Sequence, residues 1–156
     1  MDLARLSDQL TGRVVIVGVG NLLKGDDGFG PAMIERLRGK VAVPLFDCGI
    51  VPENYLKPIR QERPETVLVL DTADFSSQPG TIAVIESSRW RGGGFSSHSI
   101  SLKLFADLIS QDTGANVLLL AIQPKQLGFG ENMSPEVREG CRRLQRWLED
   151  ALSSDS

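Results

Sequence analysis

The sequence has only two cysteines, Cys48 and Cys141, and no long apolar run. Two cysteines are too few for a disulfide framework, so we expect a protein of a reducing compartment, the cytoplasm. The longest uninterrupted apolar run covers residues 117–122, whereas roughly 20 residues are needed to cross a bilayer. Residues 1–10 are charged and lack the apolar core of a signal peptide. We therefore expect no contact with a membrane.

Positive charge is not in excess either. The sequence has 17 lysines and arginines against 20 acidic residues, a net charge of -3, and no block of Lys or Arg. Binding to nucleic acid or to anionic lipid depends on such a block. We therefore expect no nucleic acid or membrane as partner, but a protein or a small ligand.

The length of 156 residues suits one domain, with a core that removes roughly two thirds of the unfolded surface from water. We place this domain at residues 13–152, between a polar leader at residues 1–12 and a polar tail at residues 153–156. Three leucines of the leader are spaced for a turn or two of helix. The sequence has no internal repeat and no low-complexity tract.

Apolar runs alternate with amphipathic segments along the domain. The runs that predict strands cover residues 14–17, 43–46, 66–70, 81–85 and 117–122. The segments that predict helices cover residues 29–38, 55–62, 98–109 and 135–151. This alternation predicts an α/β fold of three layers, with a mostly parallel five-stranded sheet and helices on both faces. The fourth run follows the third too closely for a helical crossover, so we expect one antiparallel edge strand.

The glycines after the first strand raise the question of nucleotide binding. Gly18 and Gly20 begin a G-x-G pattern, but the dinucleotide fingerprint would need a third glycine at Leu23. The adjacent Asp26 and Asp27 would repel a pyrophosphate from the start of the next helix. A nucleotide-binding α/β protein is therefore the weaker hypothesis, and the glycines are interpreted as a tight turn.

Acidic residues follow two of the predicted strands. The candidates are Asp26 and Asp27 after the first strand, Asp71 and Asp74 after the third, and His98 at a helix start. Ligands of open α/β sheets bind outside the carboxyl ends of the strands, so these side chains converge if the two strands are neighbours. Carboxylate and imidazole together suit zinc or nickel, and three protein ligands leave positions open for water or substrate. The pattern is compatible with a divalent metal site.

Other interpretations of the same residues stay open. Asp71 and Asp74 can cap the loop that follows them, and Asp27 can be the N-cap of the next helix. His98 can be an ordinary surface residue beside the serine-rich loop expected over residues 87–97.

A thiol mechanism is a further possibility. Cys48 and His98 are the one Cys-His pair of which both members can lie near the carboxyl ends of the strands in the fold. No serine occurs in the G-x-S-x-G context of a nucleophile elbow. The preferred interpretation of Cys48 is a small buried residue.

The order of short motifs along the chain carries a resemblance to a known family. The motifs are Gly18-Val19-Gly20-Asn21, Gly25-Asp26-Asp27-Gly28, Gly30-Pro31, Asp47-Cys48-Gly49, Pro52-Glu53-Asn54, Asp71-Thr72-Ala73-Asp74, Pro79-Gly80, His98, Gln123-Pro124 and Ser134. With them, residues 14–147 resemble the hydrogenase maturation protease family, and within it most of all the hydrogenase 3 type. The ordered combination is far more specific than any single motif.

This resemblance implies a protein of the α/β class that is a hydrolase, often classed as an aspartic-type endopeptidase. Members of the family remove the C-terminal extension from the precursor of the NiFe-hydrogenase large subunit, once nickel has been installed there. They recognise the nickel with two carboxylates and a histidine, which correspond here to Asp27, Asp71 and His98. The nickel is supplied by the precursor, and other divalent ions can occupy the site. Asp74 and Asp26 are the candidates for a general base.

Two positions depart from the pattern of the family. Asp27 stands where many relatives have Glu, a difference shared with the hydrogenase 3 branch. Relatives commonly have Asp-Gly-Gly where this sequence has Asp47-Cys48-Gly49. A cysteine in place of the middle glycine reduces the backbone freedom of that loop. The alternative function for the same residues is a noncatalytic metal-sensing chaperone of the precursor.

Overall fold

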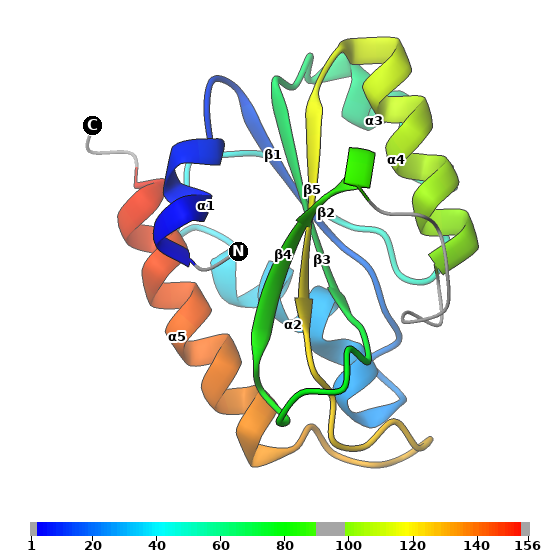
Figure 1. The fold of residues 1–156 in the computed structure, drawn as a ribbon, viewed down its shortest axis with the longest axis vertical. Helices are drawn as coiled ribbons and strands as arrows, with labels where there is room; N and C mark the ends of the chain where they lie inside the picture. The colour runs from blue at the N-terminus through cyan, green and yellow to red at the C-terminus, as the bar shows by residue number, and fades with distance from the viewer. Residues whose placement is uncertain (1–2, 90–98, 154–156) are drawn as a thin grey trace.

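The computed structural model describes residues 3–89 and 99–153. Its centre is one sheet with the strand order β2-β1-β3-β5-β4 (Figure 1). The strands are β1 Val14–Gly18, β2 Leu45–Asp47, β3 Thr66–Thr72, β4 Ile82–Glu86 and β5 Asn116–Ile122. The predicted five strands are confirmed, with small shifts of their ends.

The pairing within the sheet is mostly parallel. Strand β1 pairs parallel with β2 and β3, and β3 pairs parallel with β5. Strand β4 pairs antiparallel with β5, with Ile82 opposite Ile122. The prediction of one antiparallel edge strand is confirmed, because the short connection from β3 to β4 leaves no room for a helical crossover.

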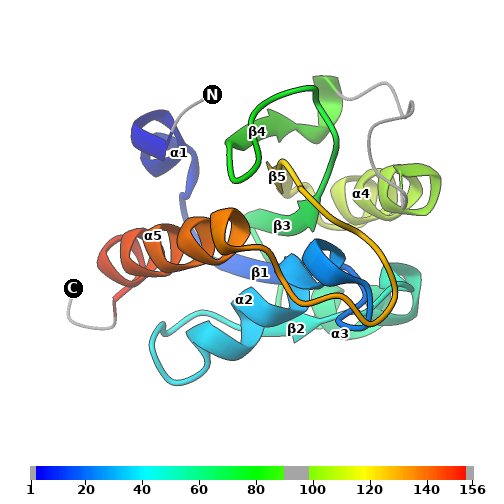
Figure 2. The ribbon, with the colours of Figure 1, turned by 90° about the horizontal axis from the view of Figure 1, so that it is seen from below.

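Helices cover both faces of the sheet, which gives the three predicted layers (Figure 2). The helices are α1 Leu3–Gln9, α2 Phe29–Leu37, α3 Leu56–Gln61, α4 Ser99–Thr113 and α5 Pro135–Ala151. Helices α1, α2 and α5 enclose one core with Leu6, Met33 and Leu144. Helices α3 and α4 enclose the other with Ile59 and Phe105. In the part of the chain described, no helix has the length and apolarity that crossing a membrane requires.

The central strand β3 is buried along its whole length. Its side chains alternate between the faces, so Leu68 and Leu70 lie in the core under α2 and α5 and Val69 lies in the core under α4. The strand is two residues longer than predicted, so that Asp71 lies within it. The same alternation directs Asp71 to the α4 side and Thr72 to the α2 side.

The residues before the first strand pack with the domain. The predicted short helix is confirmed as α1, and Leu6 on it is fully buried in the core beneath α2 and α5. Leu3 and Leu10 pack against the same core. Residues 3–10 therefore contribute apolar surface to the fold although their composition is polar.

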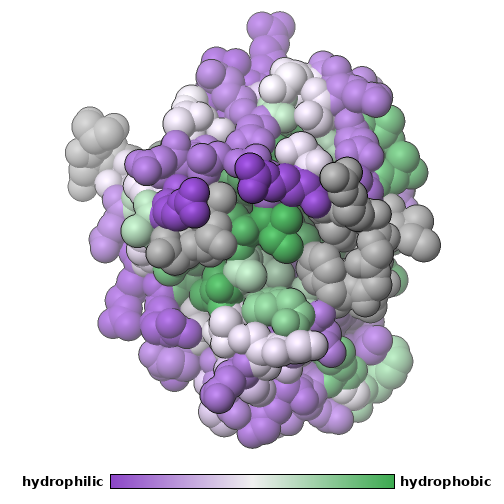
Figure 3. Space-filling model, viewed as in Figure 1, coloured by the Kyte–Doolittle hydropathy of each residue, from purple (hydrophilic) through white to green (hydrophobic). Residues whose placement is uncertain are grey.

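The face that Figure 1 presents has an apolar centre. Figure 3 shows hydrophilic side chains over most of this face and a hydrophobic area in the middle, where β4 lies. Ile82 and Ile85 of β4 are half-buried and pack against the two cores. The apolar area is thus the outer side of the edge strand, continuous with the core.

Helix α4 continues to Thr113, four residues beyond its predicted end, and short 3-10 helices account for other differences from the prediction. The segment predicted over residues 55–62 begins earlier, as the 3-10 helix Pro52–Tyr55, and continues as α3. A 3-10 helix, η1, forms at Gly25–Gly28, directly before α2. In the loop expected over residues 87–97, Ser87–Arg89 forms a 3-10 turn and the remainder lies outside the described residues.

Helix α2 begins in backbone contact with the sheet. A Cβ atom on Gly30 would lie within 3.0 Å of the carbonyl oxygens of Val19 and Leu70, and one on Gly18 would meet the carbonyl oxygen of Gly30 equally closely. Only glycine at both positions allows this approach. It brings η1, and with it Asp27, to the carboxyl end of β3.

Candidate functional site

Asp27 is buried on η1, with 3% of its surface exposed. The peptide N–H of Asn21 donates to its Oδ2 at 2.9 Å. The hydroxyl of Thr72 donates to its Oδ1 at 3.1 Å. Both carboxylate oxygens therefore accept a fixed hydrogen bond, which orients the group. The alternative of Asp27 as N-cap of α2 is wrong, because the cap is Gly28 and no side chain caps that helix.

Asp71 is fully buried near the end of β3. Its Oδ1 accepts the peptide N–H of Thr72 at 2.8 Å. Thr72 thus donates to both predicted carboxylate ligands, with its peptide N–H to Asp71 and its hydroxyl to Asp27. Two of the three predicted ligands thus bond to one residue at the carboxyl end of β3.

The third predicted ligand, His98, lies outside the described residues. Helix α4 begins at the next residue, Ser99. This helix runs antiparallel to β5, so it begins on the side of the sheet where the strands have their carboxyl ends (Figure 1). Among residues 3–89 and 99–153, no three side chains of the kinds that ligate metals gather into a site. The triad with His98 stays a prediction.

Asp26 is held in a different direction from its neighbour Asp27. It is fully buried and its carboxylate accepts four hydrogen bonds, from the peptide N–H groups of Lys125 and Gln126 and from both the N–H and the hydroxyl of Ser134. Their donor–acceptor distances run from 2.7 to 3.1 Å. The hydroxyl of Ser134 also accepts from Val137 N, which confirms it as the N-cap of α5. Asp26 therefore fastens η1 to the start of α5.

Asp74 is exposed in the loop after β3. Its Oδ1 accepts the peptide N–H of Ser76 at 3.0 Å and the side-chain amide of Gln123 at 3.1 Å. These bonds, that from Ser76 first, lower the pKa of Asp74 below its usual range. The predicted capping of the loop is confirmed for Asp74. A carboxylate with a lowered pKa is a weaker general base, so its catalytic role stays a prediction.

Three residues of the site had no functional assignment in the sequence analysis. Thr72 and Asn21 orient Asp27, and Gln123 holds the loop after β3 through its Oε1, which accepts the N–H groups of Phe75 and Ser77. All three stand within the motifs that carry the family resemblance. For Thr72 the further signal was a hydroxyl beside Asp71 at a strand end.

Cys48 does not have the surroundings of a nucleophile. It is buried in the core under α3 and α4, and burial, with a smaller contribution from Asp47, raises its pKa to about 12. At neutral pH the thiol therefore stays protonated, and a thiolate is the form that attacks. The interpretation of Cys48 as a small buried residue is confirmed.

The start of α2 does not suit a phosphate. Gly20 has a φ of +146° and turns the chain closely past the carbonyl of Asp27. Directly before the helix stand the two buried carboxylates of Asp26 and Asp27. Negative charge at this point opposes a bound pyrophosphate, so the structure gives the nucleotide hypothesis no support.

A cavity of about 310 Å³ opens at the carboxyl end of β1. It lies between the loop after β1 and the loop after β2, which are joined by a hydrogen bond from Gly20 N to Gly49 O at 2.8 Å. Asn21, which donates to Asp27, is one of the residues that line it. The cavity is therefore linked to the candidate site through Asn21.

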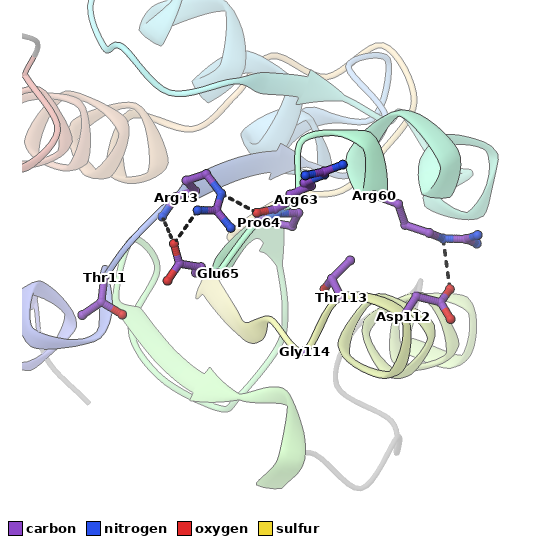
Figure 4. Close-up of a pocket in the computed structure, with 9 residues that line it drawn as sticks. All are labelled: Thr11, Arg13, Arg60, Arg63, Pro64, Glu65, Asp112, Thr113 and Gly114. Atoms are coloured by element: carbon purple, nitrogen blue, oxygen red, sulfur yellow. Dashed lines mark hydrogen bonds and ion pairs between the residues drawn. The ribbon is translucent and has the colours of Figure 1, made fainter.

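A second cavity, of about 540 Å³, lies at the amino-terminal end of the sheet (Figure 4). Arg13 Nη1 is 3.0 Å from Glu65 Oε1, and Arg60 Nε is 3.0 Å from Asp112 Oδ2. These exposed pairs neutralise one another and contribute little to stability. Because Arg13 precedes β1 and Glu65 precedes β3, the length of the strands separates this cavity from Asp27.

These features define the class of protein: an α/β fold whose mostly parallel sheet carries two buried, hydrogen-bonded carboxylates at the carboxyl end of its central strand. The family model described as hydrogenase maturation protease matches residues 31–151. The chain belongs to the hydrogenase maturation protease family, a family of hydrolases, as its motifs predicted.

Named relatives and solved structures agree with this assignment. The hydrogenase 3 maturation protease of Escherichia coli K12 is 31% identical over 141 residues, which cover 86% of this chain and 88% of that protein. The crystal structure of the NiFe hydrogenase maturation protease HycI from Thermococcus kodakarensis KOD1 has a TM-score of 0.89 at 31% identity, covering 96% and 99% of the two chains. The solution structure of the endopeptidase HycI from Escherichia coli has a TM-score of 0.79 at 29% identity, covering 89% and 90%.

Proposed function

We propose that this protein is an endopeptidase that removes the C-terminal extension of a NiFe-hydrogenase large-subunit precursor, and that it acts on the precursor only when nickel is bound there. The observation that carries the proposal is the shared contact of Thr72 with Asp27 and Asp71. Two buried carboxylates that accept hydrogen bonds from one residue, in a member of a protease family, form a site suited to a cation. The cytoplasmic location stays a prediction.

In this proposal the metal belongs to the substrate. Asp27 and Asp71 would supply oxygen ligands and His98 a nitrogen ligand, a donor set that suits nickel and zinc. Carboxylates that ligate a metal are themselves hydrogen-bonded in most sites, as both are here. A precursor without metal would lack the cation that the carboxylates hold, and this is the physical basis of the proposed selectivity.

The chemistry divides between the precursor and this chain. The nickel of the precursor supplies a Lewis acid close to the bond that is cut. Asp27 and Asp71 hold the precursor in place, and Thr72 keeps Asp27 in the required orientation. A general base would take the proton from the water that attacks the peptide bond. Of the two candidates we favour Asp74, because Asp26 uses both carboxylate oxygens in bonds to the β5–α5 loop and to Ser134. Asp74 bonds through Oδ1 alone in the part of the chain described.

Intact-mass measurement of the precursor tests the proposal. The purified protein is incubated with nickel-loaded precursor and, separately, with metal-free precursor. We expect the loaded precursor to lose the mass of its extension and the metal-free precursor to keep its mass. Complex formation on a native gel with no loss of mass from the loaded precursor would instead support a noncatalytic chaperone.

Variants of the ligands extend this test. We expect Asp71→Ala and His98→Ala each to abolish processing while the circular-dichroism spectrum stays that of the wild type. Cleavage by both variants at the wild-type rate would exclude the proposed ligand set.

A further inference from the structure

Five large apolar side chains are exposed on three loops at the carboxyl end of the sheet. They are Leu22 and Leu23 after β1, Ile50 after β2, and Leu127 and Phe129 after β5, and we call them the apolar rim. Phe129 is 74% and Leu23 69% exposed. Exposed apolar side chains that gather in one place mark binding surfaces, because water contact with them is unfavourable. The rim stands at the same end of the sheet as Asp27 and Asp71.

Contacts between the loops hold the rim in place. The peptide N–H of Gly130 donates to the carbonyl of Leu23 at 2.9 Å, and the ammonium group of Lys24 lies 5.5 Å from the ring centroid of Phe129. The side chain of Asn21 accepts the N–H of Leu23 at 2.9 Å. The loops after β1 and β5 thus form one fixed surface, which lowers the entropy that binding has to overcome.

The cavity between the loops after β1 and β2 is part of this surface. Leu22 and Ile50 of the rim line it together with Pro31 and Asn21. Asn21 donates its peptide N–H to Asp27, so a group in the cavity lies one residue from the candidate ligand. A volume of about 310 Å³ admits one or two apolar side chains and excludes a folded element.

We propose that the apolar rim and its cavity bind an extended apolar segment of the precursor, next to the bond that is cut. This inference rests on the proposed function. The occupant follows from proximity: Asn21 lines the cavity and donates to Asp27, so the segment next to a metal held by Asp27 lies within reach of the cavity. The enzyme would then hold its substrate at two places, by the metal and by apolar side chains, and the second contact does not depend on the metal.

The double variant Leu22→Ser/Ile50→Ser tests the rim, with Leu104→Ser as its matched control. Leu104 is 56% exposed on α4, close to the 53% of Ile50, and lies outside the rim. For nickel-loaded precursor we expect the double variant to raise KM by about tenfold or more and to leave kcat within twofold. We expect Leu104→Ser to leave both constants unchanged.

A binding measurement separates the rim from the metal contact. A fluorescent, metal-free peptide that spans the cleavage site of the precursor is titrated with each protein, and anisotropy is recorded. We expect wild type and Asp71→Ala to bind it with the same Kd, and the double variant to bind about tenfold more weakly.

The outcomes distinguish the two proposals. Wild-type processing together with an unchanged KM and an unchanged peptide Kd in the double variant overturns the rim and leaves the proposed function intact. Absence of processing by the wild type overturns the proposed function, and the peptide titration then still decides whether the rim binds the segment.

Discussion

The hydroxyl of Thr72 donates a hydrogen bond of 3.1 Å to Asp27, 45 positions earlier in the sequence. The peptide N–H of the same residue donates to Asp71 at 2.8 Å. The pleat of β3 makes this possible, because Asp71 and Thr72 project from opposite faces at the end of the strand. One residue therefore fixes the relation between two carboxylates that come from different elements.

Replacing Thr72 should reduce processing without unfolding the protein. Thr72→Val keeps the shape of the side chain and removes the donor to Asp27, so we expect processing to slow by about 10- to 100-fold. Thr72→Ser keeps the hydroxyl and should retain most of the activity. The rates are compared on nickel-loaded precursor, with thermal unfolding as the check on folding. A Thr72→Val enzyme as fast as wild type would show that this bond does not matter.

The adjacent residues Asp26 and Asp27 should have different roles, Asp26 mainly in stability and Asp27 mainly in activity. Asp26→Ala leaves the N–H groups of Lys125, Gln126 and Ser134 without their acceptor, so we expect the free energy of unfolding to fall by about 3–5 kcal/mol. Asp27→Ala should lose processing at a smaller cost in stability. Urea unfolding curves and cleavage assays on both variants check this. An Asp26→Ala protein as stable as wild type would contradict the role assigned to Asp26.

Cys48 should be unreactive in the folded protein. Its pKa of about 12, against an ordinary value of 9.0, reduces the thiolate fraction at pH 8 by about 1000-fold. The raised pKa favours the neutral thiol in the folded state. The contribution of the Cys48 thiol to the free energy of unfolding is complete below pH 9 and is lost as the pH rises toward 12.

Labelling with a disulfide reagent such as DTNB compares the reactivity of Cys48 in the folded and in the unfolded protein. We expect slow reaction of native protein at pH 8 and rapid reaction of both cysteines in guanidinium chloride. Cys48→Ser should process the precursor normally. Loss of activity in that variant would restore the thiol mechanism.

Gly30 should tolerate no side chain. A Cβ atom there would meet the carbonyl oxygens of Val19, directly after β1, and of Leu70 in β3, which are backbone atoms and cannot move aside. We expect Gly30→Ala to lower the free energy of unfolding by about 3 kcal/mol or more. Gly39→Ala is the control, since its Cβ meets no atom within 4 Å and its φ of +74° costs only about 1–2 kcal/mol. Equal unfolding midpoints for the two variants would contradict the close packing of α2.

Much of the fold could be predicted from local pattern. Strands β1, β3 and β5 are buried on both faces, so their uninterrupted apolar runs were clear in the sequence. The edge strand β2 has only three residues, all half-buried, and its predicted range was displaced because no strong pattern marks its ends.

The candidate site could be predicted only in part. The position of Asp26 and Asp27 after a strand indicated both residues as candidates. Their side chains point in different directions because each bonds to residues that are distant in the sequence. The partners of Asp26 lie 99 to 108 positions away, and that of Asp27 lies on β3. Thr72 could not be assigned, because its role arises from the strand register and from the approach of η1.

The central claim is that Asp27, Asp71 and His98 together ligate one metal ion. Crystals of the protein soaked with Ni²⁺ or Zn²⁺ and measured at the absorption edge of the metal test it directly. We predict an anomalous peak at about 2.0–2.2 Å from a carboxylate oxygen of Asp27, one of Asp71 and an imidazole nitrogen of His98. A metal bound elsewhere on the protein, with none of these three side chains as a ligand, would contradict the claim.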